Sequence, residues 1–169
     1  ILDEGLTLVE GIIPNLKKTA ALIGIAEKGY ASFEISAEQD GGHSSMPKNE
    51  NVITILSEAL TKINKEQMST KITLPVKNFL KSISKEMDFP YNFILGNPEI
   101  FENIIVSSFS KTVAGNATLR TTTAITVFNS GVKDNVIPNY AKAIINFRIL
   151  PTQRSEDVYN HLKKVLKDS

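Results

Sequence analysis

The sequence has no cysteine and no tryptophan, only two histidines, and no excess of either charge. Without cysteine it can form neither a disulfide nor a thiolate metal site. Its formal net charge of +1 gives no long-range field that would favour nucleic acid or an anionic membrane, so we expect neither as a partner. No apolar run approaches the ~20 residues that span a bilayer, and no secretory signal is recognisable. The sequence does not indicate a cellular compartment.

The length and composition are those of one globular domain. The 169 residues include 41% hydrophobic and 22% charged side chains, which is close to the average for folded proteins. The chain opens with Ile1-Leu2-Asp3-Glu4-Gly5 and has no methionine at position 1. We therefore interpret it as a piece of a longer protein.

Alternating hydrophobicity predicts three strands. Residues 30–38 alternate strictly between apolar and polar side chains, as in a strand with one solvent-exposed face. Residues 121–128 are rich in Thr, Ile and Val, and the turn signal Asn129-Ser130-Gly131 follows them. Residues 140–150 alternate again, so we expect the last two strands to form a hairpin.

Apolar residues at helical spacing predict two helices. The first begins near Val52 and runs to about Ile63, with Asn49 or Asn51 available as its N-cap. The second begins at Ser155, which we expect to cap it, and it carries acidic residues in its first turn and lysines toward its end. Each helix has one apolar face to bury.

The order strand, helix, insertion, strand, strand, helix predicts an α+β fold. It matches a ferredoxin-like β-α-β-β-α-β sandwich, an antiparallel sheet with helices on one face, whose last strand is missing from this sequence. Residues 1–28 are interpreted as the edge of a preceding domain and a linker, and residues 29–169 as the sandwich. Prolines divide the insertion, at about 66–119, into short helices predicted at 76–87 and 98–112; we expect this insertion to cover something.

Three polar residues stand out, although each has an ordinary structural explanation. His43 lies in the loop sequence GGHSSMP, where a histidine commonly bonds nearby backbone. Asn135 precedes the sequence Val-Ile-Pro and suits a turn. Arg148 alternates with the apolar residues of its strand, which places it on the helix-free face of the sheet. There it either pairs across strands, for example with Glu34, or contacts a ligand.

The residues alone give little support for a metal site or for nucleic-acid binding. Asp3 and Glu4 are adjacent carboxylates, but zinc needs at least three protein ligands, and only His43 and His161 supply imidazole. The sequence has no phosphate-binding glycine loop, no nucleophile elbow and no basic strand with paired aromatics. Chemistry of those classes is therefore not expected.

Four segments, taken together, resemble a known family. They are LDEG at 2–5, AEKGYASFEISAEQDGGHSSMP at 26–47, RTTTAITVFNSGVKDNVIP at 120–138 and AIINFRILP at 143–151. In order and spacing they are similar to the lid, or dimerisation, domain of the zinc-dependent exopeptidases that include aminoacylase and carboxypeptidase G. The segment FPYNFILGNPEIFENII resembles the branch of carboxypeptidase S, the Gly-Xaa carboxypeptidases and the N-acyl aromatic amino acid hydrolases.

The resemblance implies roles for four residues. Glu4, in the family's Asp-Glu-Gly motif, would be a ligand of one of two zinc ions held by a separate catalytic domain. His43 would reach into an active site, usually that of the partner subunit, and stabilise the oxyanion. Asn135 and Arg148 would hold the substrate's carboxylate end, and we expect both to gather with His43 on the helix-free face of the sheet.

The resemblance also implies what the parent protein does. The parent would hydrolyse the amide bond of dipeptides or N-acyl amino acids with a free carboxylate. The other zinc ligands and the general base lie outside this sequence, so we expect the fragment to be inactive and to bind no zinc. A homodimer through the lid is expected, since residues 121–128 would form an unpaired edge. The alternative is a stand-alone ferredoxin-like association module, with His43 and Arg148 as ordinary surface residues.

Overall fold

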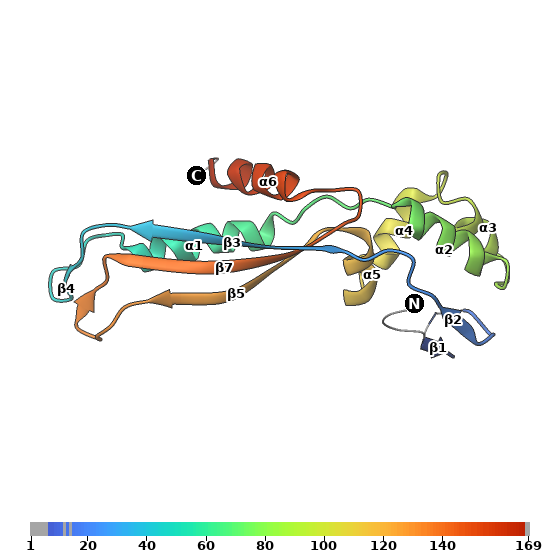
Figure 1. The fold of residues 1–169 in the computed structure, drawn as a ribbon, viewed down its shortest axis with the longest axis horizontal. Coiled ribbons are helices and arrows are strands. Elements are labelled where there is room, and N and C mark those ends of the chain that lie inside the picture. Colours follow the sequence, from blue (N-terminus) through green and yellow to red (C-terminus); the bar gives the residue numbers. More distant parts are fainter. Residues whose placement is uncertain (1–6, 12, 14, 168–169) are drawn as a thin grey trace. The chain divides into compact units, whose positions relative to one another are not determined.

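The fold is taken from a computed structural model, which describes residues 7–11, 13 and 15–167 of the chain. The described residues form two compact units (Figure 1). Unit 1 takes its residues from Ile1–Lys28, Thr70–Arg120 and Leu150–Thr152, and unit 2 takes them from Gly29–Ser69, Thr121–Ile149 and Gln153–Ser169. Within the described residues, no helix has both the length and the apolar character needed to cross a membrane.

Unit 2 is built on a three-stranded antiparallel sheet. Its strands are β3 (Gly29–Glu38), β7 (Tyr140–Ile149) and β5 (Thr122–Ser130), in the order β3-β7-β5. The central strand β7 pairs along its whole length with β3, from Gly29 opposite Ile149 to Glu38 opposite Tyr140. The three predicted strands are confirmed to within two residues at each end. A β-bulge interrupts β5 between Ile125 and Val127.

Two helices cover one face of this sheet: α1 (Val52–Lys65) and α6 (Ser155–Lys167). Every second residue of β7 is buried beneath them, and the largest of these is Phe147. The rings of Phe147 and Phe33 meet edge to face with centroids 5.6 Å apart. An α+β fold with helices on one face of an antiparallel sheet is therefore confirmed. The fourth strand that would complete a ferredoxin-like sandwich stays a prediction.

Asn51 is the N-cap of α1. Its side-chain oxygen accepts hydrogen bonds from the backbone N–H groups of Ile53 (2.9 Å) and Thr54 (3.3 Å). The hydroxyl of Thr54 in turn accepts from the Asn51 N–H at 3.0 Å, which completes a capping box. The expectation that Ser155 caps α6 is wrong. Ser155 is the first helical residue, and the Asp157 carboxylate accepts the Arg154 N–H at 2.7 Å.

The cap gives a first prediction. Replacing Asn51 by alanine leaves two N–H groups of the first turn without their acceptor, and we expect a loss of about 1 kcal/mol in the free energy of unfolding. Urea denaturation followed by circular dichroism measures this loss. Asn49→Ala is the matched control, because Asn49 is exposed and no cap bond involves it. Equal losses in the two variants would contradict the assignment of the cap.

Unit 1 contains a β-hairpin and four short helices. The hairpin pairs β1 (Thr7–Val9) with β2 (Ala20–Leu22) in antiparallel fashion. The helices are α2 (Leu74–Ser84), α3 (Tyr91–Gly96), α4 (Glu102–Phe109) and α5 (Val113–Leu119). The prediction of helices at 76–87 and 98–112 was incomplete, because it missed the short helices α3 and α5. These are only six and seven residues long.

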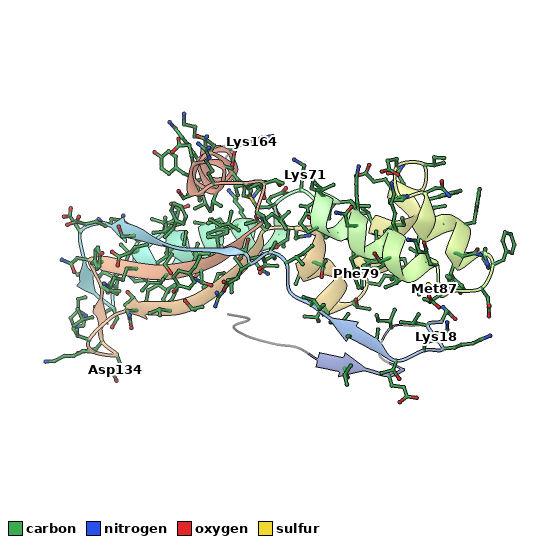
Figure 2. All side chains as sticks on the ribbon, turned by 45° about the vertical axis from the view of Figure 1, so that its right-hand side comes forward. Lys18, Lys71, Phe79, Met87, Asp134 and Lys164 are labelled. Carbon is green, nitrogen blue, oxygen red and sulfur yellow. The ribbon has the colours of Figure 1, made fainter. Side chains whose placement is uncertain are left out.

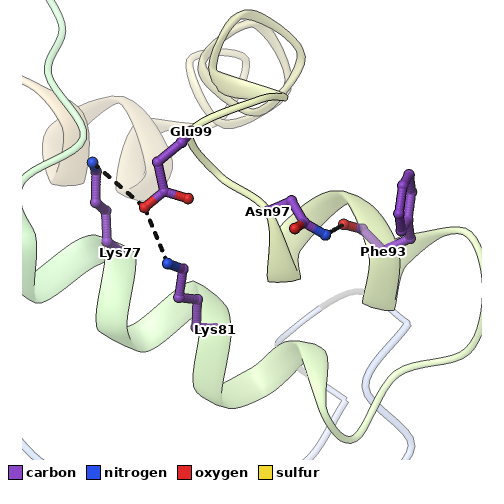
Figure 3. Close-up of polar contacts among 5 residues, drawn as sticks. All are labelled: Lys77, Lys81, Phe93, Asn97 and Glu99. Carbon is purple, nitrogen blue, oxygen red and sulfur yellow. Dashed lines mark hydrogen bonds and ion pairs between the residues drawn. The ribbon is translucent and has the colours of Figure 1, made fainter.

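The helices of unit 1 enclose their own apolar core. Leu80, Ile105 and Leu119 are fully buried in it, and Met87 and part of Phe79 (both labelled in Figure 2) pack around them. Polar contacts tie the segment between α3 and α4 to α2, as Figure 3 shows. The Glu99 carboxylate contacts the ammonium groups of Lys81 at 3.0 Å and Lys77 at 3.7 Å. A backbone hydrogen bond and then the Lys81 hydrogen bond lower the pKa of Glu99.

Candidate functional site

His43 lies in a small two-stranded ribbon of unit 2. The ribbon pairs β4 (Gly42–His43) with β6 (Val136–Ile137), and His43 stands opposite Val136. It lies beyond the ends of β3 and β7, where Glu38 and Tyr140 pair (Figure 1). Gly41 permits this pairing, because a Cβ there would lie 2.6 Å from the carbonyl oxygen of Ile137. Gly41 therefore serves close backbone approach, whereas a Cβ at Gly42 would meet no atom within 4 Å.

The hydrogen bonds of His43 define which ring nitrogen carries the proton. The backbone N–H of Ser45 donates to Nδ1 at 3.3 Å, and the Ser45 hydroxyl lies 2.8 Å from the same atom. A backbone N–H can only donate, so Nδ1 is an acceptor and the proton of the neutral imidazole is on Nε2. The His43 side chain is exposed. The loop thus holds a ring that offers an N–H donor at its outer end.

Asn135 lies beside His43. Its backbone carbonyl accepts the N–H of Ser44 at 3.3 Å, and β6 begins at the next residue. Asp134, labelled in Figure 2, precedes it in the turn that leads into β6. The Asn135 side chain is exposed. The structure therefore brings together two of the three residues that were expected to gather.

Arg148 lies at the other end of the sheet. It pairs with Tyr30 and Thr122, whereas Tyr140, at the opposite end of β7, is next to the His43 ribbon. The eight residue steps from Tyr140 to Arg148 rise about 26 Å along the strand. The expectation that Arg148 gathers with His43 and Asn135 within one chain is therefore wrong. The 12 residues between Asn135 and Arg148 lie mostly in extended strands, so the arginine is far along the chain direction from Asn135.

The side chain of Arg148 does point to the helix-free face, as the alternation predicts. It is exposed, while its neighbours Phe147 and Ile149 are buried beneath the helices. Its guanidinium carbon lies 5.0 Å from the centre of the Tyr30 ring, a cation–π contact. The ion pair with Glu34 is not formed, because Lys142 contacts that carboxylate at 3.2 Å.

Hydrogen bonds between polar side chains of β7 and β3 lead to Tyr30, the ring that Arg148 contacts. The Asn146 amide donates to the Ala31 carbonyl (3.4 Å) and to the Ser32 hydroxyl (3.3 Å), and Ser32 lies 3.3 Å from the Tyr30 hydroxyl. The alternating pattern of the two strands does predict that these side chains are on the polar face. The contacts of Asn146 with Ser32 and of Arg148 with Tyr30 depend on the register between β3 and β7, which no local pattern encodes.

A cavity of about 690 Å³ opens at the His43 end of unit 2. Residues from the adjoining ends of β4, β5, β6 and β7 line it, among them Gly42, Asn129, Val132, Pro138 and Lys142. Sequence reasoning missed this cavity, since its walls come from four separate segments. It lies on the same end of the sheet as His43 and Asn135.

The described residues do not themselves make a metal site. Residues 7–11, 13 and 15–167 contain no group of three His, Asp or Glu side chains placed to hold an ion. Glu4, the expected zinc ligand, lies outside the described residues. A single carboxylate cannot hold zinc, which takes three or four ligands from protein. Zinc chemistry is therefore not assigned to any described residue.

Comparison with known proteins identifies relatives over the whole chain. The profile of the peptidase dimerisation domain matches residues 25–169. Probable carboxypeptidase S-like 2 of Dictyostelium discoideum is 40% identical over 169 residues, which cover 99% of this chain and 32% of that protein. The N-fatty-acyl-amino acid synthase/hydrolase PM20D1 of Homo sapiens is 39% identical over 170 residues, which cover 100% of this chain and 34% of that protein.

A solved structure shows the same fold. The M20 family metallo-carboxypeptidase of Sulfolobus solfataricus aligns with a TM-score of 0.51 and 17% identity, over 84% of this chain and 40% of that chain. The chain spans about a third of the length of the relatives it matches. The match from residue 25 to residue 169 includes His43, Asn135 and Arg148. The chain belongs to the dimerisation domain family of the M20 peptidases.

Proposed function

We propose that this chain is the lid domain of a dimeric dizinc hydrolase. The parent cleaves the amide bond of dipeptides or N-acyl amino acids that have a free carboxylate. The family match and the names of the relatives, which include carboxypeptidases and N-fatty-acyl-amino acid hydrolases, support this proposal. The observation that carries it is that His43 and Asn135 lie side by side at one end of the sheet: His43 stands opposite Val136, and Ser44 donates to the Asn135 carbonyl, while the His43 ring has its proton on Nε2.

In this proposal, His43 binds the oxyanion that develops on the attacked carbonyl. An N–H donor aimed at developing negative charge stabilises the transition state more than the ground state. The Ser45 contacts hold the ring with Nδ1 as acceptor, so that the donor is already on the outer nitrogen. Asn135 adds an amide beside it. A domain that closes over the site also excludes water, which strengthens both bonds.

Arg148 holds the substrate carboxylate in this proposal. Its guanidinium makes two parallel charge-assisted bonds to a carboxylate, and the Tyr30 ring beneath it limits its motion. A span of about 26 Å along β7 is too long for Arg148 and His43 of one chain to contact the same small substrate. We therefore assign the His43 and Asn135 contacts to one copy of the chain and the Arg148 contact to the other.

The zinc ions belong to the rest of the parent protein. When bound there, zinc polarises the carbonyl and activates water. Glu4 is proposed as one of its ligands, and the other ligands would come from the part of the parent protein that this chain does not span. The described residues contribute binding and orientation of the substrate only.

We test the proposed function by comparing the 169-residue chain with the complete reading frame that contains it. We expect the isolated chain to show no zinc-dependent hydrolysis of N-acyl amino acids or dipeptides, because it lacks the general base and most zinc ligands. The complete protein should hydrolyse them and lose activity with a chelator. Zinc-dependent turnover by the isolated chain, or none by the complete protein, would refute the proposal.

Dimerisation is proposed to use the edge of β5. Among the residues that the structure describes, this strand pairs with β7 alone, and Ile125, Val127 and Phe128 expose more than a third of their surface along it. A second copy would supply the missing hydrogen-bond partners and cover these apolar side chains. The family description, a peptidase dimerisation domain, supports this.

The edge gives a further prediction. Ile125→Lys introduces a charge that would be buried between two copies, and we expect it to weaken dimerisation at least ~10-fold. Sedimentation velocity over a range of concentrations measures the dissociation constant. Val113→Lys, at a highly exposed valine of α5, is the control and should leave the constant unchanged. Unchanged dimerisation of Ile125→Lys would exclude this edge.

The alternative is a stand-alone association module, and the same described features fit it as well as they fit the lid domain. The described residues combine an open apolar edge strand with no cluster of metal ligands. Such a module would dimerise as well, so sedimentation does not distinguish the two functions. The hydrolysis assay on the complete reading frame does, because only the lid domain has a catalytic neighbour.

A further inference from the structure

Another cavity of unit 2 lies between the two helices that cover its sheet. Its volume is about 330 Å³, and its walls are Lys62 and the C-cap Glu66 of α1, together with His161, Lys164 and Val165 of α6. Lys164 is labelled on α6 in Figure 2. The cavity is on the helix side of the sheet, so it is separate from the face to which Arg148 points.

A hydrogen bond between the helices fixes the proton of His161. Its Nε2 atom lies 2.7 Å from the backbone carbonyl oxygen of Glu66. A carbonyl oxygen can only accept, so Nε2 is the donor and Nδ1 of the neutral imidazole keeps its lone pair. The ring atom that is left for a ligand is therefore an acceptor.

Charges of both signs line the cavity without pairing with one another. Lys62 and Glu66 are one helical turn apart, yet neither they nor Lys164 form an ion pair within residues 7–11, 13 and 15–167. The cavity therefore presents two ammonium groups, one carboxylate and one neutral acceptor, beside the apolar side chain of Val165.

We propose that this cavity binds a small aliphatic α-amino acid in its zwitterionic form. The carboxylate of the amino acid accepts from Lys62 and Lys164, and its ammonium donates to the Glu66 carboxylate and to Nδ1 of His161. Its side chain packs against Val165. The volume is at the low end for ligand sites, which suits a small molecule.

The lining disfavours ligands of a single charge. The Glu66 carboxylate would repel a phosphate dianion, and His161 would offer it no proton. Two lysines would repel a simple cation. Only a molecule with both charges uses every polar group of the cavity, and this conclusion does not rest on the proposed hydrolase.

The test is a titration of the nitrogen-15-labelled 169-residue chain with L-valine at pH 8 and constant ionic strength, followed by NMR. We expect the backbone amide signals of Glu66, His161 and Val165 to shift and to saturate. Isovalerate lacks the ammonium of valine and isobutylamine lacks its carboxylate, so each should bind at least fivefold more weakly. A response to valine that does not saturate, or a smaller difference from either analogue, would overturn the proposal. Tighter binding of inorganic phosphate than of valine would overturn the assignment to a zwitterion.

Charge-removing variants with matched controls locate the site. Glu66→Gln should weaken valine at least fivefold without weakening isovalerate, because only valine has an ammonium. Lys164→Gln should weaken both ligands. Glu58→Gln and Lys163→Gln are the controls, since these exposed residues of the same helices do not line the cavity, and they should leave both affinities unchanged. A loss of valine affinity below fivefold in Glu66→Gln would also refute the site, and the three probes decide on the unmodified chain even if a variant fails to fold.

Discussion

Replacing His43 by alanine in the complete enzyme is expected to lower kcat by a factor of about 10²–10³, the usual effect of removing one oxyanion donor. The fold should not suffer, because the imidazole is exposed and its only described contacts are with Ser45. Steady-state kinetics on an N-acyl amino acid measure the loss, and thermal unfolding checks stability. The loss should fall on kcat rather than KM, since the donor acts where charge develops.

Mixed dimers test whether two copies share each site. In a dimer of His43→Ala with Arg148→Ala, one active site would receive the intact His43 and the intact Arg148, and the other would receive neither. Random mixing gives about half mixed dimers with one working site each, so roughly a quarter of wild-type activity should return. His43→Ala mixed with Asn135→Ala is the control and should not recover, because both residues act from the same copy. Recovery in the control, or none in the test, would contradict the assignment.

The second large effect is on stability. Phe147→Ala is expected to reduce the free energy of unfolding by about 3–5 kcal/mol, because it leaves a cavity in a close-packed core. Phe147 is 0% exposed near the C-terminal end of β7 and contacts Phe33 edge to face. Urea denaturation measures the loss. Tyr159→Ala, on the solvent side of α6, is the control and should cost less than about 1 kcal/mol.

A small loss for Phe147→Ala would mean that the helices do not close over this strand. The result also bears on function, since Arg148 is the next residue along the chain. The buried phenylalanine fixes the strand, and the strand fixes which way the arginine points. We therefore expect Phe147→Ala to raise the KM of the complete enzyme as well.

Alternation was enough to locate the sheet of unit 2. A period of two is a strong signal where one face is buried, and it also gave the correct face for Arg148. The same signal says nothing about which ends of strands meet. Arg148 is far from His43 because β3 and β7 pair along their whole length, with Glu38 opposite Tyr140 and Gly29 opposite Ile149. This register is a long-range property.

The insertion shows where local signals failed. The N-cap residues of α3 and α4 are Pro90 and Phe101, and neither makes a side-chain cap hydrogen bond, so the usual start signals are missing. Six to eight residues are also too few for a helical period to stand out. The sequence could not predict which nitrogen of His43 carries the proton, because this depends on the hydrogen bond from the backbone N–H of Ser45.

The length of β7 has a consequence for how the parent enzyme would behave in dilute solution. If the two ends of this strand serve different active sites, a single subunit cannot complete an active site. It has Arg148 for its own site but lacks the His43 and Asn135 contacts that a second copy supplies. Specific activity should then fall as the enzyme is diluted below the dissociation constant of the dimer. An inactive copy added in excess should inhibit the active subunits, because most of them would pair with a copy that cannot complete their sites.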